Sequence, residues 1–144
     1  MEDIQRQKVM TQIIKKIKIH ALSKPAEEVC GFIVEKDNNI LLKECKNISS
    51  TPEKKFEIHP EAYLSTKLES DIIAIYHSHP SNATFSETDK IMSRINCLPS
   101  VLYINEKDSF ETFFPDLCKK YKIEKVRDLI NGWCIYAWNF WGEI

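Results

Sequence analysis

The feature that most constrains the fold is the stretch 71–76, which is apolar without interruption after Asp71 and leads directly into His77-Ser78-His79-Pro80. A short run without alternating polar residues predicts a central β-strand that is buried on both faces. Because neighbouring strand residues face opposite sides, His77 and His79 point the same way and Ser78 points elsewhere. Two imidazoles on one side of a strand end can bind one ion, so we interpret this stretch as a metal site.

A third ligand candidate follows at the start of a predicted helix that reaches about Cys97. Ser86-Glu87-Thr88-Asp89 has the pattern of a capping box, in which Ser86 caps the helix and Asp89 returns the hydrogen bond. With the two histidines nearby, Asp89 on the first turn can also face them and supply a carboxylate oxygen. Two imidazoles and one carboxylate leave a fourth position for water, which is typical of catalytic zinc.

Two further histidines have simpler interpretations. His59 precedes Pro60 at the start of a predicted helix. It is a candidate for another imidazole ligand, but an ordinary helix-start residue is the favoured interpretation. His20 lies in the last turn of a predicted N-terminal helix, where an imidazole suits the helix dipole, and we interpret it as a helix-end residue.

The remaining periodicities predict an α/β or α+β protein with a mixed sheet and helices packed on it. The first two predicted strands, 30–34 and 40–42, are expected to form an antiparallel hairpin that turns at residues 37–39. Predicted helices cover 4–22, 60–69, 86–97 and 116–130, and predicted strands cover 30–34, 40–42, 54–58, 71–76, 100–104 and 110–114.

Length, charge and cysteine usage limit the function. The 144 residues, 43% of them hydrophobic, are enough for one core, so a single domain over 1–144 is expected. The net charge of -1 gives no field that would draw the chain to nucleic acid or to an anionic membrane. No stretch has the apolar length of a signal peptide or a membrane span, and the five cysteines include no C-x-x-C pair. We therefore expect a soluble cytoplasmic protein with reduced thiols.

The C-terminal part, residues 116–144, is predicted to be a helical extension of a core over about 4–115. Residues 132–141 contain all three tryptophans. Docking of this aromatic segment onto the sheet as a terminal helix is favoured, and a surface patch for a partner or a second copy of the chain is the alternative. Cys134 is a poor candidate nucleophile because no histidine follows it in the chain.

Three separated motifs together resemble the signature of the JAMM (MPN-plus) zinc metallopeptidases. They are Glu28-Val29-Cys30-Gly31, His77-Ser78-His79-Pro80 and Ser86-Glu87-Thr88-Asp89. The resemblance covers about residues 26–115 and is closest to small prokaryotic and phage versions. It implies a single MPN-like domain. The loop 80–85 has six residues where the family pattern usually has seven.

The resemblance also implies a role for each residue of the motifs. His77, His79 and Asp89 would bind zinc, with water in the fourth place. Glu28 would take a proton from that water and give it to the leaving amine, and Ser86 would donate a hydrogen bond to the oxyanion. These roles agree with zinc chemistry, which activates water and polarises a carbonyl, so that a nearby carboxylate suffices as the proton shuttle.

Three functions are consistent with the resemblance. The first is a zinc-dependent peptidase or deubiquitinase-like isopeptidase that cleaves after the C-terminal tail of a ubiquitin-like protein. The second is a phage tail-type peptidase acting in assembly or on the cell wall. The third is a catalytically silent MPN scaffold that only binds protein partners.

Overall fold

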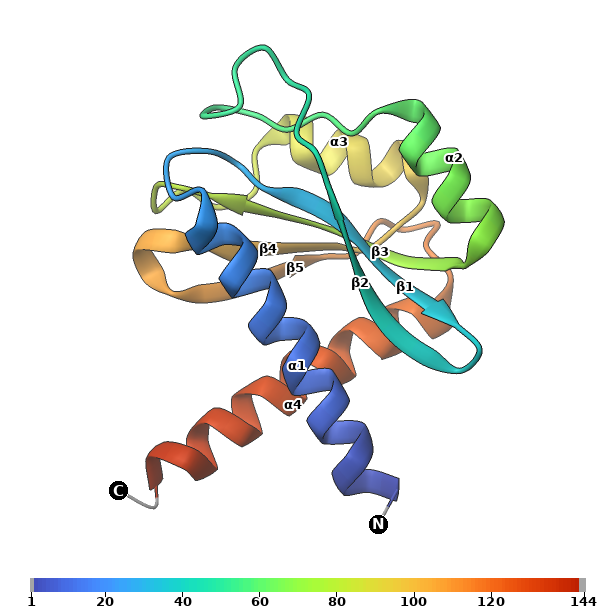
Figure 1. The fold of residues 1–144 in the computed structure, drawn as a ribbon, viewed down its shortest axis with the longest axis vertical. Helices are drawn as coiled ribbons and strands as arrows, with labels where there is room; N and C mark the ends of the chain where they lie inside the picture. The colour runs from blue at the N-terminus through green and yellow to red at the C-terminus, as the bar shows by residue number, and fades with distance from the viewer. Residues whose placement is uncertain (1, 143–144) are drawn as a thin grey trace.

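The structure is a computed structural model that describes the backbone of residues 2–142 and the side chains of residues 12–131. Along the chain, helices separate a β-hairpin, a single strand and a second β-hairpin, which together form one sheet (Figure 1). The elements are α1 (Glu2–Ser23), β1 (Cys30–Lys36), β2 (Asn39–Cys45), α2 (Pro60–Glu69), β3 (Asp71–His79), α3 (Glu87–Asn96), β4 (Ser100–Ile104), the 3₁₀ turn η1 (Asn105–Lys107), β5 (Ser109–Phe113) and α4 (Lys120–Gly142).

The five strands form one mixed sheet in the order β2-β1-β3-β4-β5, which confirms the predicted α+β class. The neighbours β3 and β4 are parallel, and the other neighbouring pairs are antiparallel. As predicted, β3 is central and buried, but it does not end at His77. It continues through His79, which pairs with Ile104 of β4. Both histidines are therefore held on a paired strand.

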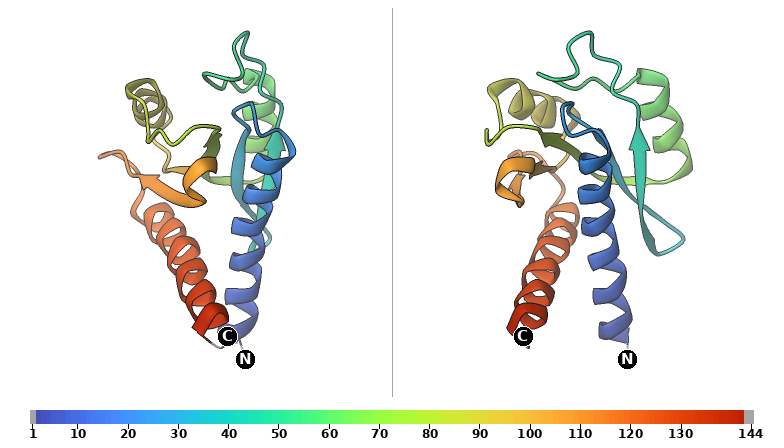
Figure 2. Two further views of the ribbon diagram at one scale, coloured as in Figure 1. Left: turned by 90° about the vertical axis from the view of Figure 1, so that its left-hand side faces the viewer. Right: turned by 60° about the vertical axis from the view of Figure 1, so that its left-hand side comes forward.

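The two faces of the sheet carry different helices. Figures 1 and 2 show α2 and α3 on one face and α1 and α4 on the other. The α1/α4 face buries Ile17, Ile73 and Leu129 in one apolar cluster, and the opposite face buries Phe32 and Ile75 in another. Since strand residues alternate, His77 and His79 emerge on the same face as Ile75, under α2 and α3.

The hairpin between β1 and β2 is confirmed. Asp37 and Asn38 have positive φ values of 52° and 65°, and Lys36 pairs with Asn39 across them. Two consecutive residues with positive φ are the mark of the type I′ turn, whose twist matches that of the paired strands. The turn fixes the register that places Cys30 opposite Cys45, next to the chain segment that carries Glu28.

One predicted strand and one predicted helix start are wrong. Residues 54–58 are not a strand, because the backbone of this segment bonds to Asn47 and Ile48 and does not join the sheet. The last helix begins at Lys120 and not at Asp116. A turn precedes it, in which the Cys118 N–H donates to the Pro115 carbonyl at 3.1 Å. This helix then runs through Gly142, but the side chains of 132–141 lie outside the described residues, so the prediction for the aromatic segment stays a prediction.

The described cysteines 30, 45, 97 and 118 are unpaired, whereas the side chain of Cys134 lies outside the described residues. None of the described helices combines the length and apolarity that crossing a membrane requires.

Candidate metal centre

The two histidines and Asp89 meet at one point beyond the end of β3. The Nε2 atoms of His77 and His79 lie 3.3 Å apart, and Asp89 Oδ2 lies 3.2 Å from each of them. His77 is 1% exposed and Asp89 is 8% exposed. The carboxylate of Glu28 completes a buried group whose four ligand atoms lie within 4.8 Å of one another.

Asp89 reaches this point because the start of α3 is a capping box. The Ser86 Oγ accepts a hydrogen bond from the Asp89 N–H at 3.1 Å, and the Ser86 N–H donates to Asp89 Oδ2 at 2.9 Å. Asp89 therefore completes the capping box and faces the histidines at the same time. The six-residue loop 80–85 is long enough to place Asp89 beside the histidines. A hydrogen bond that Thr84 donates to Glu111 ties this loop to β5.

Glu28 is fixed by a contact that joins the chain before β1 to the end of β3. The Val29 N–H donates to the Ser78 Oγ at 3.0 Å, and the Ser78 N–H donates to the Val29 carbonyl at 3.0 Å. Glu28 Oε2 then lies 3.8 Å from His79 Nε2, while Glu28 Oε1 is buried without a hydrogen-bond partner among the described residues. The carboxylate of Glu28 is thus beside the histidines but less tightly engaged than that of Asp89.

Burial and mutual contacts shift the pKa values in opposite directions. Burial raises the pKa of Glu28 to about 7. The nearby charge of His79 opposes this shift, and the charge of Asp89 adds to it. Burial also acts to raise the pKa of Asp89, but hydrogen bonds from both imidazoles and from the Ser86 N–H outweigh it and hold this pKa well below its usual range. Burial lowers the pKa of His77. Burial acts to lower the pKa of His79, but its hydrogen bonds to Asp89 and to the Ala83 carbonyl outweigh burial and raise this pKa. An ionised Asp89 and a neutral His77 have the protonation that metal binding requires, whereas a protonated His79 would release its proton on binding.

The spacing of the donor atoms fits a tetrahedral zinc ion. Zinc bonds to nitrogen and oxygen are about 2.0–2.1 Å long, so two ligand atoms of a regular tetrahedron lie about 3.3–3.4 Å apart. The three separations among His77, His79 and Asp89 are 3.2, 3.2 and 3.3 Å. His79 also has the outer hydrogen bond that is usual for a metal ligand, from Nδ1 to the Ala83 carbonyl at 2.9 Å.

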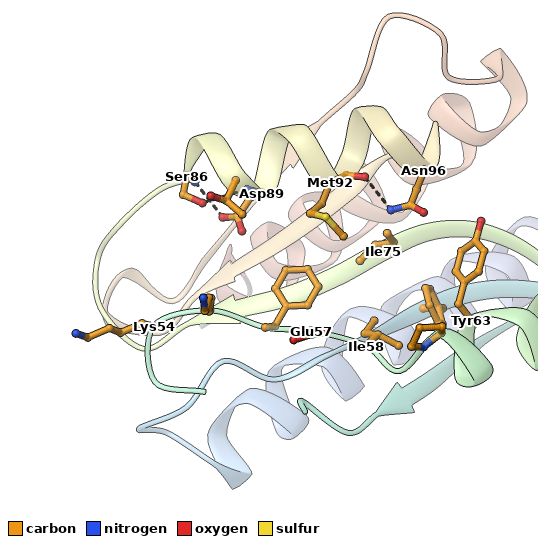
Figure 3. Close-up of a pocket in the computed structure, with 14 residues that line it drawn as sticks. Lys54, Glu57, Ile58, Tyr63, Ile75, Ser86, Asp89, Met92 and Asn96 are labelled. Carbon is orange, nitrogen blue, oxygen red and sulfur yellow. Dashed lines mark hydrogen bonds between the residues drawn. The ribbon is translucent and has the colours of Figure 1, made fainter. Parts of the chain in front are cut away.

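Two cavities flank the metal group, and both are lined by Ser86 and Lys54. The smaller has a volume of about 340 Å³ and is lined by Glu28 and His79. The larger has a volume of about 700 Å³ and is an apolar groove under α3. Figure 3 shows it extending from Ser86 and Asp89 at one end of α3 to Asn96 at the other. Ten residues of helix correspond to a groove of about 15 Å.

All five predicted site residues are brought together, namely Glu28, His77, His79, Ser86 and Asp89. The other two histidines lie elsewhere, as predicted. The exposed His59 caps α2 by accepting the Glu61 N–H at 3.1 Å, and His20 Nδ1 lies 2.8 Å from the Tyr76 hydroxyl.

Three supporting residues were not predicted from the sequence. Asn47 donates to the Glu28 carbonyl, Phe56 stacks on His77, and Ser78 bonds to the backbone of Val29. Ser78 carried a usable signal, because a hydroxyl between two ligands at the end of a buried strand needs a partner. Asn47 and Phe56 lie in a loop of ordinary composition, and no sequence pattern singles them out.

The fold and the buried group of one glutamate, two histidines and one aspartate define a JAB-type (JAMM, MPN) domain with a potential metal site. The profile of the prokaryotic homologs of the JAB domain matches residues 10–115, and the chain belongs to this family.

Two known proteins are similar to the chain. The chain is 33% identical over 87 residues to tail tip assembly protein K of Escherichia phage N15. That alignment covers 60% of this chain and only 36% of the phage protein. A solution structure of a Desulfitobacterium hafniense protein has a TM-score of 0.54 at 18% identity, covering 72% of this chain and 87% of that one. This second likeness shows a shared fold.

Proposed function

We propose that the protein is a zinc-dependent metallopeptidase that hydrolyses amide or isopeptide bonds at the C-terminal tail of a ubiquitin-like protein. The observation that carries this proposal is the convergence of His77, His79 and Asp89 at the spacing of zinc ligands, with the Glu28 carboxylate buried beside them. His77, His79 and Asp89 would hold the ion. When bound, zinc lowers the pKa of a coordinated water and polarises a carbonyl.

The other two site residues supply proton transfer and charge stabilisation. Glu28 accepts a proton from the attacking water and donates it to the leaving amine, and its unpartnered Oε1 is available for this transfer. The Ser86 Oγ uses a lone pair to accept the Asp89 N–H, which leaves its own hydrogen free. That hydrogen is donated to the carbonyl oxygen as negative charge develops there.

The two cavities support an extended peptide as the substrate. An extended chain advances about 3.3–3.4 Å per residue, so a groove of about 15 Å takes roughly four residues. Glu28 lines only the smaller cavity, so the leaving amine faces that side. The acyl side of the substrate then lies in the apolar groove along α3. A flexible C-terminal tail can enter this groove while the folded part of a ubiquitin-like protein stays outside.

The test is incubation of the zinc-loaded chain with fusions of candidate ubiquitin-like proteins, with and without a chelator. Replacing Glu28 by Gln keeps the shape and removes the base, so hydrolysis is expected to fall about 10²- to 10⁴-fold while zinc stays bound. Glu27→Gln, at the neighbouring acidic residue that lines neither cavity, is the matched control and should keep activity. Unchanged hydrolysis by Glu28→Gln, or no bound metal in the wild type, would refute the proposal.

A second candidate, a phage tail-type peptidase, is supported by the similarity to tail tip assembly protein K. Tail genes beside the coding sequence would favour it, whereas a neighbouring ubiquitin-like protein with an activating enzyme would favour the first. The third candidate, a silent scaffold, predicts a folded protein that hydrolyses no substrate.

We also propose that residues 1–144 act as one cytoplasmic domain. Val126 and Leu129 of α4 share a core cluster with Ile13 and Ile17 of α1, which supports a single domain. Limited proteolysis tests this proposal, because early release of residues 116–144 as a separate fragment would contradict it.

A further inference from the structure

The two histidines at the metal centre are held in different ways. His79 has an outer hydrogen bond from Nδ1 to the Ala83 carbonyl at 2.9 Å, which sets the orientation of its ring. His77 has none, because its Nδ1 is buried and has no hydrogen-bond partner among the described residues. Rotation of a histidine ring about χ2 is only weakly restricted by intrinsic torsional preference. Something other than an outer hydrogen bond must therefore orient His77.

Two phenylalanine rings contact His77 in different geometries. Phe56 stacks on the imidazole with ring centres 4.5 Å apart and an angle of 27° between the planes. Phe85 meets it edge to face, with centres 5.9 Å apart and an angle of 63°. We call Phe56 and Phe85 the aromatic clamp. A ring stacked on the imidazole and a second ring steeply inclined to it together leave little room for rotation about χ2.

Phe56 is itself tied to the site through Asn47. The Asn47 amide nitrogen donates to the Glu28 carbonyl at 2.8 Å and to the Lys55 carbonyl at 3.0 Å. Its side-chain oxygen accepts the Glu57 N–H at 3.0 Å. The residues on both sides of Phe56 are thus bonded to one side chain, which also holds the backbone of Glu28. This explains how an irregular segment can present a ring in a fixed position.

We propose that Phe56 is a positioning residue for the metal centre, which orients His77 by stacking in place of the missing hydrogen bond. This inference rests on the proposed function only for the metal site and is independent of the substrate. Phe56 also lines the apolar groove. The ring that orients a metal ligand is therefore part of the surface that an extended substrate would touch.

The test compares zinc affinities by competition with a chelator and records the visible absorption of the Co²⁺-loaded protein. Phe56→Leu keeps an apolar side chain but loses the flat ring. It is expected to weaken zinc binding about 10- to 100-fold, as loss of an outer-shell partner does, and to change the cobalt spectrum. Phe56→Tyr keeps the ring and is expected to restore both. Tyr63→Leu is the matched control, because Tyr63 lines the same groove and packs on Phe32.

Thermal unfolding of the zinc-free variants separates a loss of folding from a loss of ligand orientation. If Phe56→Leu does not fold, Phe85→Leu tests the other half of the aromatic clamp with the same measurements. Wild-type zinc affinity and cobalt spectrum in a folded Phe56→Leu or Phe85→Leu variant would overturn the inference, and so would equal weakening by Tyr63→Leu. A wild-type chain that binds no metal would overturn the metal centre itself and this inference with it.

Discussion

Ser86 has one observed and one proposed role, which mutation can separate, because it accepts one hydrogen bond as a helix cap and is proposed to donate another to the oxyanion. As acceptor, its Oγ caps α3 through the Asp89 N–H at 3.1 Å. Loss of such a cap costs about 1 kcal/mol, which lowers the melting temperature of a chain of this size by roughly 2–4 °C. As donor to the oxyanion, the hydroxyl is worth about 10²- to 10³-fold in kcat. Ser86→Ala is therefore expected to show both losses.

Two other substitutions at the same position distinguish the roles. Ser86→Thr keeps acceptor and donor, so stability and kcat should stay close to those of the wild type. Ser86→Asp keeps the acceptor but has no proton to donate at neutral pH, so it should retain the melting temperature and lose kcat as Ser86→Ala does. The measurements are thermal unfolding, kcat on a cleaved fusion and zinc content. If Ser86→Ala loses stability but retains kcat and zinc, Ser86 is only a helix cap and its catalytic assignment is wrong.

Two further predictions concern the framework of the site. A methyl group at Gly31 would lie 2.3 Å from the Lys43 carbonyl oxygen and 2.6 Å from the Tyr76 ring. Gly31→Ala is therefore expected to cost about 3 kcal/mol of folding stability and to lower the melting temperature by roughly 6–12 °C. A shift below about 2 °C would contradict this packing argument. Asn47→Asp turns two donated hydrogen bonds into repulsive contacts with carbonyls and is expected to cost about 2–4 kcal/mol in urea unfolding. Asn82→Asp, at an exposed loop position, is the control, and equal losses in the two variants would count against the role of Asn47.

The sequence was sufficient for the central strand and for the positions of the proposed ligands because their signals are local. The apolar run fixes β3, the period of two puts His77 and His79 on one side, and the Ser-x-x-Asp spacing fixes the start of α3. Glu28 was found only through its resemblance to a family motif, since an acidic residue before a strand is usually solvated.

The parts that were mispredicted or missed depend on contacts between distant residues. Residues 54–58 alternate like a strand, but their hydrogen-bonding groups are taken by Asn47 and Ile48, so no sheet neighbour is available. Likewise, the stacking of Phe56 on His77 depends on a loop that folds back over β3. A pattern along the chain shows which side chains share a face but not which loop will cover that face.

His77, His79 and Asp89 are proposed to form a metal centre, and elemental analysis after dialysis against metal-free buffer is the decisive test of this claim. The wild type should retain one zinc ion per chain. Asp89→Asn can still accept the Ser86 N–H but loses the ligand charge, so it should retain far less zinc. Glu87→Gln, at an exposed residue of the same turn, should match the wild type. A wild-type chain without metal, or Asp89→Asn with undiminished zinc, would contradict the claim.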